Sequence, residues 1–586
     1  MKRRLSRSIA LVAALILLLT PLHSIESAVA ENPPRKILTG WLPYYSMKTY
    51  LPAVLTNADL ISEIMPFWYT LKFNANTKKA SVRDVYSPAN PSVPMVEPLT
   101  ALRAANMKII PTITDGTDKL VLANLLSKSA SRKQVIDVIV GAVESQNYDG
   151  IDLDFEGFAF IDPSSSWKAT APNWVLFIKE LSAVLHSKNK ILSVSTPYLY
   201  NPAEAQKGYF VYAWAQIAPH IDRLRIMTYD YSVSRPGPIG PITWVEKTVK
   251  YAISIMPPSK VFVGLPGYGK DWVTAVQGIC PANLAAVIKP SARAGAFLMR
   301  DGTSIAATYG AVPTYDSKFE ELTFSYKREY TGTTSSGLST TCTASRTAWY
   351  QNAQSFSVRA QLVAKYKLGG LAQWVIGQEE PLAMVAIRDV AKSIAPAPLE
   401  SSALLSAPEV TYGNPITISG LITLKDKTPV SDLAFEVVAT YLDGTTRVLT
   451  TGITGFDGKY SIPMLLGKAT SLQVITQPTW EREGSKTKPL SVKILRNLIA
   501  SPPTSVKAGS TFTISGFVLP RVADVEVQLV NTAGKAIGAV ALTDAQGAFS
   551  INVGAQVKSI VAYRISINGD ANWPPLLSSP FSIIYR

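Results

Sequence analysis

The chain has 586 residues, which is more than one hydrophobic core usually reaches, so we expect several domains. The formal net charge is +15, but the basic residues are scattered along the sequence, whereas nucleic-acid binding calls for clusters of them. Only two cysteines occur, Cys280 and Cys342, which excludes a small scaffold held together by disulfides.

Residues 1–30 have the pattern of a secretory signal. An apolar run at 9–19 is followed by the small-residue cleavage site Ala28-Val-Ala30. Four basic residues precede the run, namely Lys2, Arg3, Arg4 and Arg7. The run is shorter than the roughly 20 residues that span a bilayer, so we expect no membrane association after cleavage. The mature chain would begin near Glu31 and be secreted, either to the extracellular space or to the cell wall.

Removal of the signal, with four basic residues and one acid, lowers the charge to about +12. A weak attraction to anionic cell-wall polymers is one interpretation of this charge. A generally basic, solvated surface is the other, and we favour it because the basic residues are scattered. We expect no nucleic-acid partner and a monomeric protein.

Residues 36–394 alternate short apolar runs with amphipathic stretches, which is typical of parallel strands with helices outside them. Strands are predicted at 37–45, 61–71, 108–114, 149–158, 190–197, 222–230, 260–266 and 369–376. Helices are predicted at 131–146, 171–188, 242–256, 352–367 and 380–393, among others. Eight such units predict an α/β fold, a (β/α)8 TIM barrel over 31–395, with functional groups at the C-terminal ends of the strands.

An acidic stretch, Asp149-Gly-Ile-Asp-Leu-Asp-Phe-Glu-Gly-Phe158, ends the fourth predicted strand. Side chains alternate between the two faces of a strand, so Asp152, Asp154 and Glu156 share one face. Like charges this close raise one another's pKa, and one carboxyl then holds its proton near neutral pH. That is the property that a general acid needs.

Two other interpretations of this stretch are an acidic strand facing solvent and a calcium loop. Ile151, Leu153 and Phe155 are large and apolar, which is untypical of a solvated strand. A calcium loop spreads its oxygen ligands over a flexible turn. We therefore favour catalysis and expect no metal ion or other cofactor.

Aromatic and polar residues recur at other predicted strand ends. Sugar rings present flat apolar faces edged with hydroxyls, so aromatic side chains near carboxylates suit them, although aromatic residues also fill barrel cores. The segments are Gly40-Trp-Leu-Pro-Tyr-Tyr45, Pro66-Phe-Trp-Tyr69, Ser195-Thr-Pro-Tyr198, Met227-Thr-Tyr-Asp230 and Gln373-Trp374.

The acidic stretch resembles the Asp-x-x-Asp-x-Asp-x-Glu signature of glycoside hydrolase family 18, the chitinase-like barrels. All four positions are filled, by Asp149, Asp152, Asp154 and Glu156. Residues 227–230 are similar to the family's Met-x-Tyr-Asp motif on strand six, and Trp374 is similar to its tryptophan on strand eight. Within the family, 240–246, 255–261 and 349–355 are most similar to the bacterial spore-cortex and wall-lytic subgroup.

The resemblance implies a role for each candidate residue. Glu156 would protonate the leaving oxygen, while Asp154 would orient the substrate's acetamido N–H and share a proton with Asp152. Tyr229 would hold the acetamido oxygen, and Asp149 would be a structural support. The expected sugar contacts are Asp230, Tyr198, Trp374, Tyr45 and Trp68.

The same resemblance implies hydrolysis of β-1,4 bonds in N-acetylglucosamine-containing polysaccharide, with the substrate's own acetamido oxygen as nucleophile and retained configuration. It leaves open chitin, peptidoglycan or an N-glycan as substrate, and endo or exo action. A lectin-like protein of this fold with little or no catalysis is the alternative, and so is a wall-structural protein with a vestigial barrel. Glu156, which inactive relatives usually lose, is retained.

A long insertion at 271–350 separates the seventh strand from the next helix. Insertions of this length are usually functional or form a small subdomain, so we expect a wall of the substrate groove. An oxidising compartment favours a disulfide between Cys280 and Cys342, which would pin the insertion at its base.

After Pro396 the pattern changes to strand formers with Gly, Thr and Ser, and two lengths resemble one another at an offset of about 90 residues. Ile418-Ser-Gly420 recurs as Ile514-Ser-Gly516, and Trp480 corresponds to Trp573. The Thr-x-x-x-Gly motif at 454–461 recurs at 543–550. We expect two all-β immunoglobulin-like sandwiches, at 403–494 and 495–586, which act as spacers or as wall- or sugar-binding modules. We favour the spacer interpretation.

Overall fold

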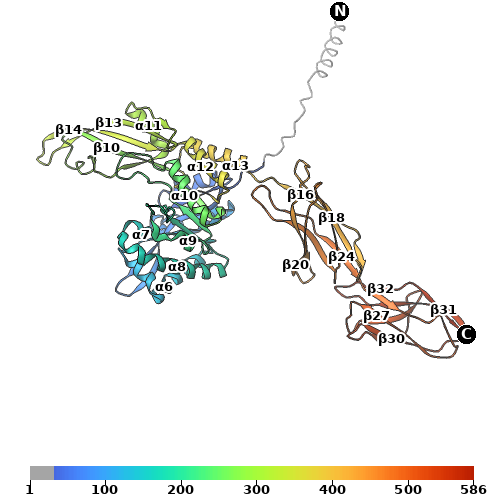
Figure 1. Cartoon of the computed structure of the whole chain (residues 1–586). Helices are drawn as coiled ribbons and strands as arrows, with labels where there is room; N and C mark the ends of the chain where they lie inside the picture. Colours follow the sequence, from blue (N-terminus) through green and yellow to red (C-terminus); the bar gives the residue numbers. More distant parts are fainter. Residues whose placement is uncertain (1–31) are drawn as a thin grey trace, which may run out of the picture. The chain divides into compact units, whose positions relative to one another are not determined.

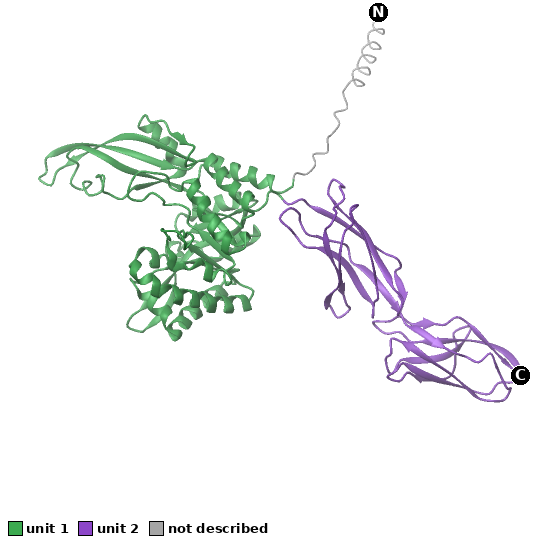
Figure 2. Cartoon of the chain, in the orientation of Figure 1, with its two compact units in different colours: residues 1–395 green, residues 396–586 purple. Residues whose placement is uncertain are grey.

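The computed structural model describes residues 32–586. They form two compact units, and the boundary between them along the chain lies between Ala395 and Pro396 (Figure 2). The predicted signal at 1–30 lies outside the described residues. From residue 32 onward, no helix is both long enough and apolar enough to cross a membrane.

The first unit is a closed barrel of eight parallel strands, as predicted. Strand β1 pairs in parallel with both β2 and β15, and these pairings close the sheet. The barrel strands are β1 (Leu38–Pro43), β2 (Ile61–Asn74), β5 (Thr112–Asp115), β6 (Gly150–Asp154), β7 (Ile191–Thr196), β8 (Arg223–Ile226), β9 (Val261–Pro266) and β15 (Gly370–Trp374). Each of the eight corresponds to one predicted strand.

The third predicted strand, 108–114, is divided in the structure. A short strand β4 (Lys108–Ile109) pairs with β2, and β5 resumes at Thr112. Pro111 lies in the gap, where its ring removes the N–H that a ladder hydrogen bond needs. Strand β2 also continues beyond its predicted end, because β3 (Lys79–Asp84) folds back and pairs antiparallel with it.

Helices cover the outside of the barrel (Figure 1). The longer ones are α2 (Met47–Thr56), α4 (Val96–Ala104), α5 (Val121–Ser127), α6 (Ser129–Ser145), α8 (Trp167–Ser187), α10 (Ile242–Ile255), α12 (Ala353–Tyr366) and α13 (Pro381–Ser393). Short turns of helix are α3 (Tyr86–Ala89), α7 (Gly157–Phe160) and α9 (Trp214–Ile217). The five helices predicted from the sequence are all present. The start of α12 has a local cause, since the Asn352 side chain accepts a hydrogen bond from the Ser355 N–H at 3.0 Å.

The insertion between β9 and α12 is a folded subdomain with its own five-stranded antiparallel sheet (Figure 1). Its elements are β10 (Tyr268–Gly278), β11 (Gly295–Leu298), α11 (Gly302–Thr308), β12 (Thr314–Asp316), β13 (Glu321–Thr333) and β14 (Ser339–Tyr350). The sheet order is β11-β10-β14-β13-β12. The insertion therefore starts directly after the seventh barrel strand.

Cys280 and Cys342 are joined by a disulfide, with their Cα atoms 4.7 Å apart. Cys342 lies near the start of β14, and Cys280 follows the end of β10. Tyr350, where β14 returns to the barrel, is eight residues from Cys342, or about 26 Å along a strand. The disulfide therefore ties the far end of the insertion, and the prediction that it pins the base was wrong.

The second unit contains two β-sandwiches with separate cores, so the predicted all-β class is confirmed. In the first, a three-stranded sheet and a six-stranded sheet share one core. Its strands are β16 (Leu399–Leu405), β18 (Ile416–Leu424) and β21 (Lys459–Met464) in one sheet, and β17 (Glu409–Thr411), β24 (Leu490–Leu495), β22 (Thr470–Thr476), β19 (Ala434–Thr440), β20 (Thr446–Ile453) and β23 (Ser485–Lys486) in the other. Its first strand begins a few residues before the predicted boundary at 403.

The second sandwich repeats this arrangement strand for strand. Its strands are β25 (Asn497–Ala500), β27 (Phe512–Leu519) and β30 (Ala548–Val553) in one sheet, and β26 (Ser505–Val506), β33 (Phe581–Tyr585), β31 (Ser559–Ile567), β28 (Glu526–Asn531), β29 (Ala536–Leu542) and β32 (Leu576–Leu577) in the other. The immunoglobulin-like relationship of the two sandwiches stays a prediction.

The repeated sequence motifs occupy equivalent positions in the two sandwiches. Thr454 accepts from the Leu433 N–H at 3.0 Å and donates to the Val430 carbonyl at 2.6 Å. Thr543 makes the matching bonds in the second sandwich, with the Val525 N–H at 2.9 Å and the Val522 carbonyl at 2.7 Å.

The repeated glycines have a matching role as well. A side chain at Gly420 would collide with the Tyr460 ring, and one at Gly516 would collide with the Phe549 ring. The sequence repeat is therefore a repeat of buried hydrogen bonds and close contacts.

Candidate active site

Strand β6 separates its side chains between two environments, as the alternation of the sequence predicts. Phe155, just after the strand, packs toward α8, with its ring centroid 6.2 Å from that of Trp174 and 6.3 Å from that of Phe177. Ile151 and Leu153 are also buried. The acids Asp152 and Asp154 therefore share the opposite face, toward the inside of the barrel.

Asp152 is fully buried below the cleft. Its carboxylate accepts hydrogen bonds from Thr112 at 2.9 Å, Ser193 at 2.5 Å and Ser195 at 2.9 Å. The guanidinium of Arg225 lies 3.7 Å from it. Asp152 is thus held in place by these three hydroxyl groups and does not line the cleft.

Asp149 comes directly before β6. Its Oδ2 accepts a hydrogen bond from the Ile109 N–H at 2.7 Å, which ties the start of β6 to β4. This acid is outside the cleft.

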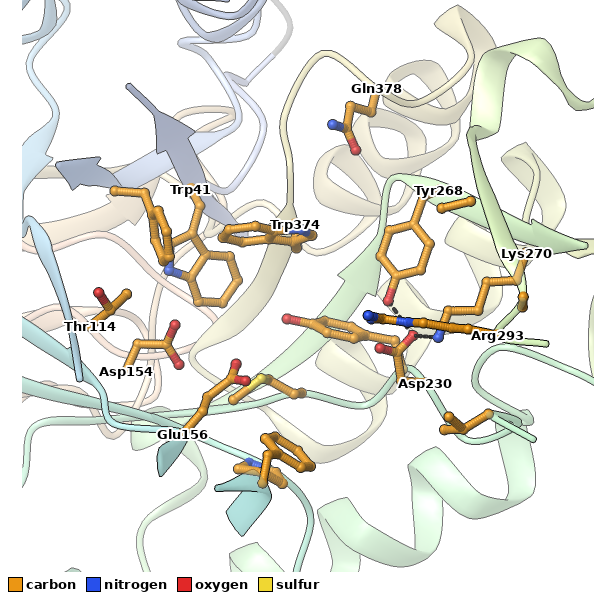
Figure 3. A pocket seen from close by; sticks show the side chains of 18 of the residues that line it. Trp41, Thr114, Asp154, Glu156, Asp230, Tyr268, Lys270, Arg293, Trp374 and Gln378 are labelled. Atoms are coloured by element: carbon orange, nitrogen blue, oxygen red, sulfur yellow. Dashed lines mark hydrogen bonds and ion pairs between the residues drawn. The ribbon is translucent and has the colours of Figure 1, made fainter. Parts of the chain in front are cut away.

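Asp154 and Glu156 line a cleft of about 1140 Å³ at the C-terminal end of the barrel (Figure 3). Burial raises the pKa of Asp154 well above its usual value, and the charges of Glu156 and Asp152 raise it further. Burial also raises the pKa of Glu156, with help from the charge of Asp230, to about 7. Glu156 therefore keeps a proton near neutral pH, which fits a general acid.

Residues after β8 and β9 form the opposite side of the cleft. Tyr229 lines it beside Asp230, which has a left-handed backbone with φ of 60°. Tyr268 donates a hydrogen bond to Asp230 at 2.5 Å, and the Lys270 ammonium lies 2.5 Å from the same carboxylate. Figure 3 shows these two contacts as dashed lines.

Aromatic side chains line another part of the cleft. Trp374, at the end of β15, packs edge-on against Trp41 at 5.8 Å and Phe67 at 4.9 Å between ring centroids. Tyr198 also lines the cleft, where its ring packs against Tyr209 at 5.4 Å. Flat aromatic side chains in the same cleft as two carboxyls are an arrangement that a sugar ring fits.

Two predicted sugar contacts do not line the cleft. Trp68 is fully buried on the other face of β2, where its ring lies 4.3 Å from that of Tyr86. Its neighbour Phe67 faces the cleft instead, because successive side chains of a strand point to opposite sides. Tyr45 is 42% exposed and packs against Tyr44 and Tyr50 outside the cleft. The assignment of Trp68 was therefore wrong, because a fully buried side chain cannot contact a sugar, whereas that of Tyr45 stays a prediction.

Sequence reasoning missed several lining residues. Trp41 and Phe67 lie within segments that were singled out, but the wrong members were selected. Tyr268 and Lys270 come directly after the seventh strand, so their position at a strand end was an available signal. Arg293 lies within the insertion, and no local pattern marks it.

The decisive comparison is with family models. Residues 45–379, more than half of the chain, match the model for glycosyl hydrolases family 18. The chain belongs to family 18. The predicted family is therefore confirmed, and it places this barrel among the glycosidases.

Named relatives of this family 18 chain include a bacterial glycosylase and a bacterial lytic enzyme. The uncharacterized glycosylase YvbX of Bacillus subtilis is 23% identical over 270 residues, which cover 45% of this chain and 68% of YvbX. The cortical fragment-lytic enzyme of Bacillus anthracis is 24% identical over 281 residues, 47% of this chain and 57% of that enzyme. This chain thus spans little more than half the length of the lytic enzyme.

Solved structures of the same fold include a chitinase from Chromobacterium violaceum, 22% identical, which covers 60% of this chain and 98% of its own with a TM-score of 0.47. The spore cortex-lytic enzyme SleL of Bacillus megaterium QM B1551 is 19% identical and covers 61% of this chain and 74% of its own, with a TM-score of 0.48.

The pKa of Glu156 predicts the pH dependence of the family 18 site. A general acid works in its protonated form, so we expect kcat/KM to fall as the pH rises through about 7. Asp230 is one cause of the raised pKa, so Asp230→Asn should move this alkaline limb to lower pH. The freed Lys270 charge acts in the same direction.

A pH profile of kcat/KM measures this shift, and only the position of the limb is read, because Asp230 also lines the cleft. Asp137→Asn, which removes an acid paired with Lys133 on the surface of α6, is the matched control. An alkaline limb at the same pH in Asp230→Asn and the control would contradict the assigned cause.

Proposed function

We propose that the protein is a secreted glycosidase that cleaves β-1,4 bonds of N-acetylglucosamine-containing polysaccharide, either chitin or peptidoglycan. The mechanism is substrate-assisted, with retained configuration and the acetamido oxygen of the substrate as the nucleophile. The lectin-like alternative is not favoured, because Glu156 is present with a pKa suited to proton transfer.

The observation that carries this proposal is the state of Asp154. Its Oδ1 is buried and has no hydrogen-bond partner within residues 32–586. A buried acceptor without a partner is costly and uncommon. The N–H of an acetamido group, on a sugar held by the aromatic side chains of the cleft, supplies the missing donor.

The chemistry follows from the two acids. Glu156 gives its proton to the glycosidic oxygen as the acetamido oxygen attacks the anomeric carbon, and an oxazolinium ring forms. The ring carries a positive charge, which the adjacent Asp154 stabilises as its carboxylate. Glu156, now ionised, then takes a proton from the water that opens the ring.

One further residue, Tyr229, supports this geometry. Tyr229 lines the same cleft as the acids. Burial raises the pKa of Tyr229 well above its usual value, and the charges of Asp154 and Glu156 raise it further. Its hydroxyl therefore stays protonated and donates to the acetamido oxygen. Attack by a group already carried on the sugar avoids much of the entropic cost of bringing two reactants together.

Substrate comparison tests the proposal. We expect hydrolysis of N-acetylglucosamine oligomers and of peptidoglycan, no hydrolysis of cellulose, and inhibition by a thiazoline that mimics the cyclic intermediate. Asp154→Asn should lower kcat by about 10²-fold or more, as loss of one group that stabilises transition-state charge does.

Asp118→Asn, a substitution of an acid that does not line the cleft, is the control. Cellulose cleaved as readily as N-acetylated polymers, or full activity in Asp154→Asn, would rule out the substrate-assisted mechanism.

A further inference from the structure

Among the residues from 32 onward that line the cleft, Arg293 is the one side chain that carries a positive charge without a partner. It lies between β10 and β11 in the insertion, and it is exposed. Across residues 32–586 it makes no hydrogen bond and no ion pair. Figure 3 shows its guanidinium directed from the insertion side toward the middle of the cleft.

The neighbouring cations are already compensated. Lys270 lies 2.5 Å from the Asp230 carboxylate. Arg346, on β14, donates to Asp271 at 3.0 Å. Asp301 lines the same cleft but forms no ion pair with Arg293 within the described residues. The guanidinium of Arg293 is therefore free to bind a group that enters with the substrate.

The acids of the cleft do not repel an anion as strongly as their number suggests. Burial raises the pKa of Asp154 well above its usual value and that of Glu156 to about 7, so at neutral pH the two carboxyls carry less negative charge than exposed ones would. The charge of Asp230 is paired with Lys270. An anionic substituent can therefore approach Arg293 from the open side of the cleft.

We propose that Arg293 recognises a carboxylate carried by the glycan beside the cleaved bond and makes the enzyme select anionic N-acetylated glycans over neutral chitin. Guanidinium binds carboxylate through two parallel hydrogen bonds, which an ammonium group cannot reproduce. A neutral chain offers the guanidinium no charged partner. This inference rests on the proposed glycosidase function and specifies its substrate class.

Two parts of peptidoglycan carry a suitable carboxylate. One is the lactyl ether on the 3-oxygen of every second sugar, which is free when no peptide is attached. The other is the set of carboxylates on the attached peptide. When that peptide is present, the lactyl carboxyl group is bound to it as an amide and carries no charge. The chemistry that Arg293 recognises is the same in both.

The test compares kcat/KM of the full-length protein and of Arg293→Ala on three substrates. These are intact peptidoglycan, glycan strands from which an amidase has removed the peptides, and the N-acetylglucosamine hexamer. We expect a loss of about 10- to 100-fold on at least one anionic substrate, the range for one charge-assisted hydrogen bond. Hydrolysis of the neutral hexamer should change less than about twofold.

Two further variants sharpen the comparison. Arg293→Lys keeps the charge without the planar fork, and we expect it to recover only part of the loss. Arg328→Ala removes a positive charge from an exposed position on β13 that does not line the cleft, and it should leave all three rates unchanged.

The pattern of the losses identifies the source of the carboxylate. A loss confined to the peptide-free strands points to the lactyl group, and a loss confined to intact peptidoglycan points to the peptide. Unchanged rates in Arg293→Ala would overturn the inference while leaving the proposed function intact. An equal loss on all three substrates, which is expected if Arg293 only positions Asp301, would do the same. Failure of the unmodified protein to cleave any of the three would instead refute the proposed function.

Discussion

Glu156→Gln should lower kcat by about 10²- to 10⁴-fold while leaving oligosaccharide binding and the fold largely intact. The amide has the shape of the carboxyl group but no proton to transfer to the leaving oxygen. The glutamine side chain would still line the same cleft as Trp374, so the sugar contacts remain. Hydrolysis of the N-acetylglucosamine hexamer measures kcat, and calorimetric titration with the same oligomer measures binding.

Glu97→Gln, an exposed residue on α4 outside the cleft, is the matched control for this substitution. The control should retain full activity. An active Glu156→Gln protein would remove Glu156 from the role of general acid, and an inactive protein that no longer binds the oligomer would show that the substitution damages the site.

Arg225→Met should destabilise the barrel by about 3–5 kcal/mol, because it leaves the buried Asp152 without a cation and Glu63 with only the partly exposed Arg223. Arg225 is fully buried inside the barrel, where its guanidinium lies 2.5 Å from Glu63 and 3.7 Å from Asp152. It also donates to Ser193, which in turn donates to Asp152. Burial by itself would raise the pKa of Glu63, but Arg225 and Arg223 outweigh that effect and hold the pKa below its usual value.

Arg223→Met is the matched control for the buried charge. Arg223 pairs with the same Glu63 at 2.8 Å, but its side chain is 23% exposed. Since water compensates a partly exposed group, we expect a smaller loss. Urea unfolding followed by tryptophan fluorescence reports on the barrel. The chain has eleven tryptophans, and only two of them, Trp480 and Trp573, lie in the second unit. Equal shifts of the midpoint in both variants would contradict the role given to Arg225.

The sequence determined the features that depend on local periodicity. Alternation across residues 149–158 places Asp152, Asp154 and Glu156 on one face, and the structure has the apolar residues between them packed on the other side. The order of strands and helices, the barrel class and the repeat in the second unit follow from the same kind of local pattern. Such patterns can be recognised in the sequence because they depend only on residues that are close together along the chain.

Other features were decided only by the tertiary structure. Alternation states that Phe67 and Trp68 face opposite ways, but the pairing of β2 with both β1 and β5 decides which one reaches the cleft. The contact of Arg225 with Glu63 joins residues 162 positions apart, and Arg293 enters the cleft only because a whole subdomain folds back over it. The sequence therefore determined which acids act together, whereas closure of the barrel and folding of the insertion decided what surrounds them, because those contacts join residues that no local pattern relates.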